Sequence, residues 1–232
     1  MNIKLFSTLL AMLVSISMYA QKPIGQNTGS TDTKTVSNTF LFWADDDVHP
    51  HPLAKDLLNK AANDVLDAAR SDCPTCNICH AVERLQKAIA IDSTYYFAYD
   101  NLIKYASQVE CYQLALRYAD RYIKVQPSDS LNIYGRRGLV RLKMGQEESA
   151  HKDFRSQIQA LDRLSAKDAT PIRMVIKAVY MALDGEKDQA LALLNSQAIE
   201  NKCKTAEDQM LLKKTRTYMR NATLKDLMNY IW

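Results

Sequence analysis

The segment Cys73-Pro-Thr-Cys76-Asn-Ile-Cys79-His80 holds the residues of this chain whose types and spacing best suit chemistry. Its two overlapping C-x-x-C spacings are typical of disulfides, of redox-active thiol pairs and of zinc sites. Cys76, Cys79 and His80 also match the C-x-x-C-H motif, in which both thiols bond a haem and the histidine ligates its iron. These residues leave four interpretations open: structural disulfides, covalent haem, a metal–thiolate site that could also use Cys111, and a redox-active pair.

Outside this segment we find no complete catalytic motif. The sequence contains no G-x-S-x-G, P-loop, H-E-x-x-H or dinucleotide-binding fingerprint. His151 and Asp153 are close in sequence, but both fall on one predicted helix without a nucleophile, so we interpret them as a surface pair. His49 and His51 follow three aspartates, but the neighbouring prolines offer no fixed metal geometry. We therefore predict a non-enzymatic protein without a metal or other cofactor.

Residues 1–20 have the pattern of a secretory signal peptide, with Lys4 before a mostly apolar run and Ala20 at the cleavage position. An uncleaved membrane anchor is the alternative, although the apolar run is short for a bilayer span. Residues 21–39 are rich in Thr, Ser, Asn and Gly, which predicts a disordered linker. We expect an exported protein in the periplasm or cell envelope, or secreted, with no membrane span after signal cleavage.

The composition of the chain is typical of an all-α protein, since 47% of its 232 residues are hydrophobic and only 6 are Gly and 6 are Pro. The formal net charge of +4 is too small and too dispersed to predict nucleic-acid binding. Residues 71–79, which contain Pro74 and the clustered cysteines, are predicted to interrupt the helical pattern. Apolar residues recur with helical spacing in the ranges 53–70, 80–91, 94–107, 110–125, 131–164, 171–195, 205–218 and 222–232.

One stretch, Leu131 to Leu164, carries Tyr134, Gly138, Gly145, Ala150 and Phe154 at a spacing that resembles a tetratricopeptide repeat, a hairpin of two antiparallel helices. Small residues such as Gly138 and Ala150 allow the two helices to approach closely, and the aromatic residues fill the space between them. Weaker copies surround this stretch. Their corresponding alanines are separated by 34, 35 and 40 residues, which is close to the usual 34-residue period. These alanines are Ala81, Ala115, Ala150 and Ala190.

The resemblance implies a right-handed α-solenoid of about four helical hairpins over residues 40–200, closed by capping helices in residues 201–232. The third interval is longer by about six residues, which predicts a longer second helix and turn at residues 161–170. Apolar residues of the last two helices would cover the open face of the last repeat, because an uncovered end is poorly soluble.

Members of this family usually bind peptides or protein segments on the concave face formed by the first helix of each repeat. Asn101 and Arg136 match two positions of a clamp for a C-terminal carboxylate, but Leu66 and Asn132 stand where lysines would be. The groove is predicted to become apolar at Ile172, Val175, Ile176 and Val179. By repeat offset, the face would carry Phe97, Asn101, Lys104, Asn132, Arg136, Leu139 and Lys143.

The repeat register also bears on the cysteines. It places Cys76 to Cys79 at the turn within the first repeat and Cys111 at the same turn of the second. Equivalent turns of stacked repeats lie side by side, so we predict a disulfide from Cys111 to Cys76 or Cys79, with Cys73 paired to the remaining one and Cys203 unpaired. We thus predict a protein-interaction module that binds an unidentified protein or peptide. The alternative is a c-type haem or redox protein that uses Cys76, Cys79 and His80.

Overall fold

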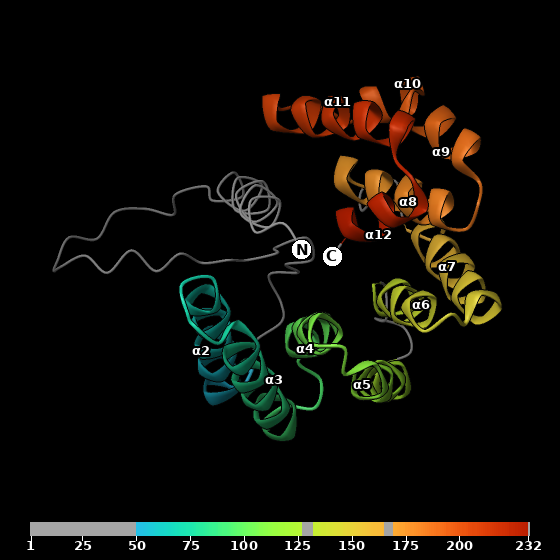
Figure 1. Ribbon diagram of the computed structural model, residues 1–232. Coiled ribbons are helices and arrows are strands. Elements are labelled where there is room, and N and C mark those ends of the chain that lie inside the picture. Colours follow the sequence, from blue (N-terminus) through green and yellow to red (C-terminus); the bar gives the residue numbers. More distant parts are fainter. Residues whose placement is uncertain (1–49, 127–131, 165–168, 232) are drawn as a thin grey trace, which may run out of the picture. The chain divides into compact units, whose positions relative to one another are not determined.

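The computed structural model describes residues 50–126, 132–164 and 169–231, with side chains described to residue 229. Within these ranges the protein is helical and contains no strand (Figure 1). The predicted all-α class is therefore confirmed. The predicted signal peptide and linker lie outside the described residues, as do residues 40–49 of the predicted repeat domain.

Each predicted helical range contains at least one helix, and only the short helix α10 was not expected. The helices are α2 (Pro52–Ala68), α3 (Pro74–Ile91), α4 (Tyr96–Gln108), α5 (Tyr112–Val125), α6 (Ile133–Lys143), α7 (Glu147–Asp162), α8 (Pro171–Leu183), α9 (Lys187–Leu194), α10 (Gln197–Glu200), α11 (Ala206–Asn221) and α12 (Leu224–Ile231).

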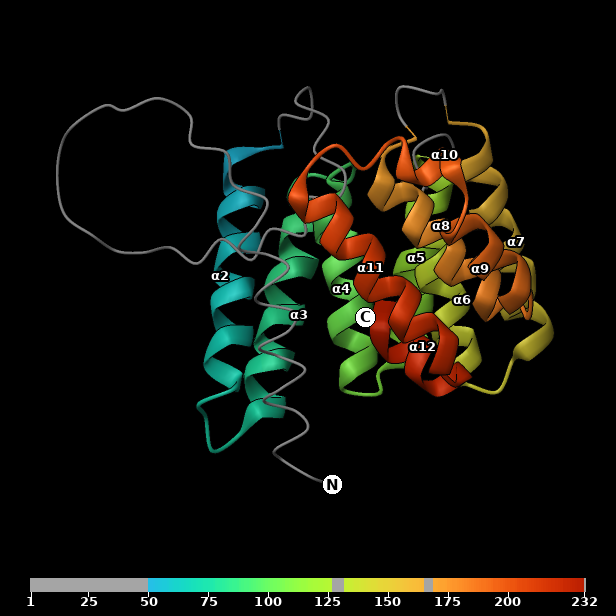
Figure 2. The same cartoon turned by 90° about the horizontal axis from the view of Figure 1, so that it is seen from above.

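Consecutive helices pack as the hairpins α2–α3, α4–α5, α6–α7 and α8–α9 (Figure 1, Figure 2). The first helices of neighbouring hairpins also meet, since α4 contacts both α2 and α6. The C-terminal helices α11 and α12 both pack against α8. Neighbouring hairpins therefore bury one another's apolar faces, as stacked helical units must.

Small residues stand where the helices of a hairpin cross, as expected. The four corresponding alanines, Ala81, Ala115, Ala150 and Ala190, are all fully buried. A Cβ atom at Gly138 would lie 2.6 Å from Cε1 of Phe154 and 3.1 Å from the carbonyl oxygen of Ala150. The close approach of α6 and α7 therefore requires glycine at position 138.

Three of the hairpins share one turn geometry. In each, the residue five positions before the corresponding alanine has a positive φ, namely Glu110, Gly145 and Gly185. The following N–H donates to a carbonyl five residues earlier, which closes the C-terminus of the first helix. These bonds are Cys111 to Ala106 at 2.8 Å, Gln146 to Arg141 at 2.9 Å and Glu186 to Met181 at 2.8 Å.

The first hairpin departs from this geometry. Its corresponding position is Cys76, which lies inside α3 rather than in a turn. The predicted interruption at residues 71–79 is therefore wrong from Pro74 onward. Pro74 begins α3, because proline fits the first position of a helix, where its missing N–H is not needed. Residues 69–73 connect α2 to α3. Relative to the corresponding alanine of each hairpin, α3 begins about one turn earlier than α5.

Candidate functional site

Polar side chains from the first helices of neighbouring hairpins meet in a buried cluster. Arg136 of α6 donates from Nε to Oδ1 of Asp100 on α4 at 2.8 Å, and the two side chains are 4% and 8% exposed. Burial lowers the pKa of Arg136, but the carboxylate of Asp100 outweighs this effect and holds that pKa above its ordinary value. The charge of Arg136 is therefore balanced inside the protein.

Tyr180 connects α8 to this cluster. Its hydroxyl donates to Oδ1 of Asn132, the residue before α6, at 3.1 Å, and Nδ2 of Asn132 lies 3.5 Å from Oδ1 of Asp100. A Cβ atom at Gly135 would lie only 2.1 Å from Cζ of Tyr180, so α6 and α8 can approach this closely only at a glycine. Helices α4, α6 and α8 are thus joined by one chain of contacts.

Two further groups of α4 lie in the cluster. Lys104 is 8% exposed, and its pKa is lowered to about 8 because burial and the nearby Arg136 disfavour its charge more than Asp100 favours it. The hydroxyl of Tyr96 is buried near Asn132, and within the described ranges no well-formed hydrogen bond reaches it. Burial also raises the pKa of Tyr96.

The seven residues predicted to line a binding groove fall into two sets. Phe97 and Asn101 are half-buried, and Lys143 is exposed, so these three remain accessible to a partner. The amide of Asn101 donates to the carbonyl oxygen of Phe97 at 2.8 Å, which orients it along α4. The other four residues are buried, and Arg136 is held by Asp100. They are Lys104, Asn132, Arg136 and Leu139.

The predicted apolar end of the groove is largely buried within the protein. Val175 and Val179 are 3% and 1% exposed, whereas Ile172 and Ile176 are half-buried. Both α11 and α12 pack against this helix, and Leu227 of α12 is 2% exposed. The C-terminal helices therefore pack on the last hairpin.

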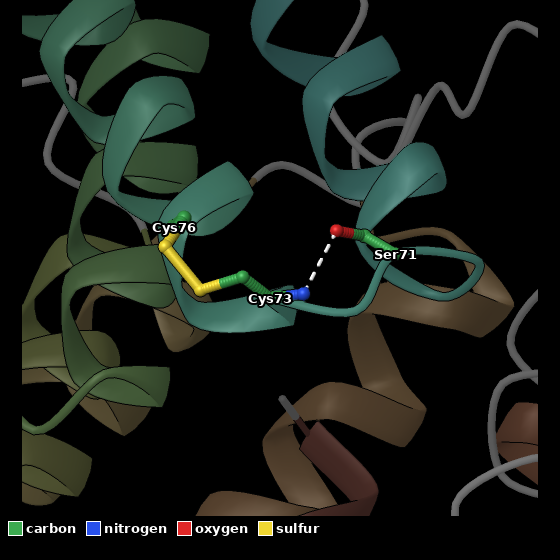
Figure 3. Close-up of a disulfide and its surroundings, with 3 residues drawn as sticks. All are labelled: Ser71, Cys73 and Cys76. Carbon is green, nitrogen blue, oxygen red and sulfur yellow. Dashed lines mark hydrogen bonds between the residues drawn. A yellow bond between two sulfur atoms is a disulfide. The ribbon is translucent and has the colours of Figure 1, made fainter.

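The pairing of the cysteines matches the prediction in part, since Cys76 is one of the two partners expected for Cys73. Cys73 is bonded to Cys76, with their Cα atoms 5.4 Å apart, at the start of α3 (Figure 3). Cys79 and Cys111 are free and exposed, so the predicted bridge from Cys111 to the first hairpin is wrong. The reason is the longer α3, which places Cys76 and Cys79 on a helix instead of in a turn level with Cys111. Cys203 is free, as expected, and it is also buried, which raises its pKa.

This pairing bears on the alternatives considered for the C-x-x-C-H motif. A thioether from Cys76 to haem needs the sulfur that is bonded to Cys73, so the disulfide would first have to be reduced. Within the described ranges, no group of three or more His, Cys, Asp or Glu side chains is arranged to hold a metal ion. Haem attachment stays an alternative that this geometry does not favour.

His151 and Asp153 do not form the predicted surface pair. Asp153 is 2% exposed and binds Arg137 and Arg141 at 2.6 Å and 2.8 Å, which fastens α7 to α6. His151 instead places Nδ1 2.7 Å from Oδ1 of Asp184, at the turn between α8 and α9. Both contacts join neighbouring helices.

Sequence reasoning missed four members of the buried cluster: Tyr96, Asp100, Gly135 and Tyr180. The available signal was the opposite charge of Asp100 and Arg136, which lie about one repeat apart on consecutive first helices. Gly135 stands in the middle of a predicted helix, where an unexplained glycine points to a close approach by another group. Neither signal identifies the partner without a structure.

Comparisons of the chain with protein families, curated proteins and solved structures gave no match. Among the described residues, no helix combines the length and the apolar character that a membrane span requires.

Proposed function

We propose that this protein is an exported, tetratricopeptide-like interaction module, a right-handed α-solenoid that binds a protein segment on the surface of its first helices. The observation that supports the proposal best is the chain of contacts from α4 through α6 to α8. First helices that touch one another form a continuous surface, which is where stacked helical repeats bind extended partners. The turn geometry shared by three hairpins supports the same interpretation.

The buried cluster prepares this surface for binding. Asp100, Arg136, Asn132 and Tyr180 fix α4, α6 and α8 relative to one another before any partner arrives. A surface that is already ordered loses less conformational entropy on association, so more of the contact energy contributes to affinity. In this proposal the buried polar residues position the surface, and the accessible residues contact the partner.

Three accessible side chains define the chemistry of the partner. Phe97 is a half-buried aromatic residue whose ring lies edge-on to Tyr96, with centroids 5.3 Å apart, and such rigid rings are common anchors at interfaces. Asn101 adds an amide, and Lys143 adds a positive charge on α6. We therefore propose a peptide segment with an apolar side chain and an acidic group.

Site-specific photo-crosslinking in cells of the source organism tests this proposal. A photoreactive phenylalanine analogue replaces Phe97 on the proposed surface or, as a control, the exposed Gln113 on the second helix α5. We expect a discrete crosslinked protein from position 97 and none from position 113. Equal crosslinking from both positions, or none from position 97, would refute the proposed surface.

A charge reversal provides the second test. Lys143→Glu is expected to weaken the 97-specific crosslink by repelling an acidic partner, whereas Lys124→Glu on α5 is the matched control. Circular dichroism of both variants checks that they are folded. An unchanged crosslink in Lys143→Glu would contradict the proposed acidic group and leave the apolar contact standing.

A further inference from the structure

The start of α3 carries a free thiol directly beside a disulfide. Cys73 is the residue that precedes the helix, Cys76 is its third residue, and Cys79 follows one turn later. All three are exposed, so that an incoming molecule can reach the bond and the thiol. Disulfides whose sulfurs are accessible are the ones that take part in exchange.

Helix geometry places Cys79 within reach of Cys76. Residues three apart on a helix lie on one face with Cβ atoms roughly 5–6 Å apart, and a disulfide needs a Cβ separation of roughly 3.5–4.5 Å. A small adjustment of the first turns closes this gap, and helix ends are the parts of a helix that fray. Cys76 can therefore bond to either neighbouring cysteine.

We propose that Cys73, Cys76 and Cys79 form a thiol–disulfide exchange site, in which Cys79 is the resolving thiol for Cys76. The Cys79 thiolate, having released its proton to water, attacks Sγ of Cys76. The Cys76–Cys79 bond forms as the Cys73–Cys76 bond breaks, and Cys73 leaves as a thiolate that then takes up a proton. The number of disulfides is unchanged, so this step needs no oxidant.

The surroundings of Cys73 suit a leaving thiolate. The positive end of the α3 dipole faces this residue, and no acidic side chain occupies the first turn of the helix. The exposed Asp72 opposes this effect from outside the helix. The N–H of Cys73 donates to Oγ of Ser71 at 3.0 Å, which holds the backbone before the helix (Figure 3).

The substrate class is a thiol of a small molecule or of a protein. The external thiolate would attack Sγ of Cys76 and form a mixed disulfide as the Cys73–Cys76 bond breaks and Cys73 leaves as a thiolate. Cys79 would then attack the same sulfur, form the Cys76–Cys79 bond and release the external thiol. His80 lies one turn from Cys76 on the same helix and lines a shallow depression with Glu83, Arg84 and Lys87, where such a molecule could make contact. This inference does not depend on the proposed binding surface.

Mapping the free thiol in the full chain tests the internal exchange. Residues 71–84 form one tryptic peptide that holds all three cysteines, because Arg70 and Arg84 are its flanking cleavage sites. The protein is incubated at pH 8 with a trace of reduced glutathione, quenched with N-ethylmaleimide, reduced, labelled with iodoacetamide and sequenced by mass spectrometry. We expect maleimide on Cys73 in part of the molecules and on Cys79 in the rest. Maleimide on Cys79 alone would overturn the exchange.

A second experiment isolates the resolving role of Cys79. Oxidised glutathione reacts with the Cys76 thiol of Cys73→Ser, and Cys79 should then release the glutathione and form the Cys76–Cys79 bond. In Cys73→Ser/Cys79→Ser the adduct should persist, at about tenfold or more the level in the single variant, since an intramolecular thiol acts at high effective concentration. Adding Cys111→Ser, which removes the other exposed thiol, should change neither result. An adduct on Cys76 that is equally stable in both variants would overturn the proposal.

Discussion

Gly135 is where the contact between the first helices α6 and α8 can be tested most directly. Replacing it by alanine adds a Cβ atom 2.1 Å from Cζ of Tyr180 and 2.5 Å from its Cε1. Carbon atoms in contact normally lie roughly 3.5–4.0 Å apart, so the ring or the helix must move by more than 1 Å. The ring of Tyr180 is fully buried and stacks on Phe154 with centroids 5.9 Å apart, which leaves it little room to move.

The size of the effect follows from three contributions. Overpacking a buried site costs roughly 1–3 kcal/mol. Moving the Tyr180 hydroxyl away from Asn132 loses a buried hydrogen bond worth about 1 kcal/mol. Alanine regains about 1 kcal/mol through its higher helix propensity. We therefore expect Gly135→Ala to lower the free energy of unfolding by about 1–3 kcal/mol.

Urea unfolding followed by circular dichroism measures this change. With a dependence of about 2 kcal/mol per molar urea, the midpoint should fall by roughly 0.5–1.5 M. Gly145→Ala is the control, because a Cβ there meets nothing within 4 Å and only its φ of 73° opposes the change, at about 1 kcal/mol. In a Tyr180→Leu background, which removes the ring, the added cost of Gly135→Ala should largely disappear. An unchanged midpoint in Gly135→Ala alone would refute the contact.

Three other predictions concern the turns and the buried charges. Glu110→Gly should raise the free energy of unfolding by about 1 kcal/mol, measured by urea unfolding, because Glu110 has a φ of 62° that glycine adopts without strain. Asp100→Asn should lower the free energy of unfolding by about 3–5 kcal/mol, because Arg136 would lose its buried counter-charge. The control is Glu148→Gln, which removes one charge of an exposed ion pair and should change the free energy of unfolding by less than about 0.5 kcal/mol. The third follows from Lys104, whose pKa of about 8 in the folded protein lies below its ordinary value of 10.5. The unfolded chain therefore binds more protons between these pH values, and stability should rise with pH across that range in the wild type relative to Lys104→Met. Equal pH profiles for the two proteins would contradict the burial of a charged lysine.

Patterns within a single helix or hairpin were the ones that sequence predicted well. Helical periodicity located the helices, because an apolar stripe must face a neighbour. The spacing of Gly138, Ala150 and Phe154 predicted a close crossing, and all three meet in the structure. Helical periodicity and the crossing of two helices in one hairpin both depend on residues that are close in sequence. The spacing of these residues therefore identifies which of them pack together.

Contacts between hairpins could not be predicted in the same way. Arg136 was expected on an accessible face because its offset alone suggests a groove position, yet Asp100 of the preceding hairpin pairs with it in a buried site. Whether a polar residue on a first helix faces a partner or the neighbouring helix depends on the local separation of the helices. That separation is set here by Gly135 against Tyr180, a contact between residues in different hairpins.

The wrong prediction for the Cys111 bridge has a different origin, which lies in the start of α3. The repeat register assumed a turn at Cys76, but Pro74 starts α3 early and adds a helical extension that the other hairpins lack. Because the Cys73–Cys76 bond closes a loop of only a few residues within the first turn, it ties α3 to no other helix and stabilises the fold less than a long-range bridge would. The stacked hairpins rely instead on buried contacts such as that between Asp100 and Arg136. A cysteine cluster on such an extension can open and re-form without disturbing those contacts, as an exchange site requires.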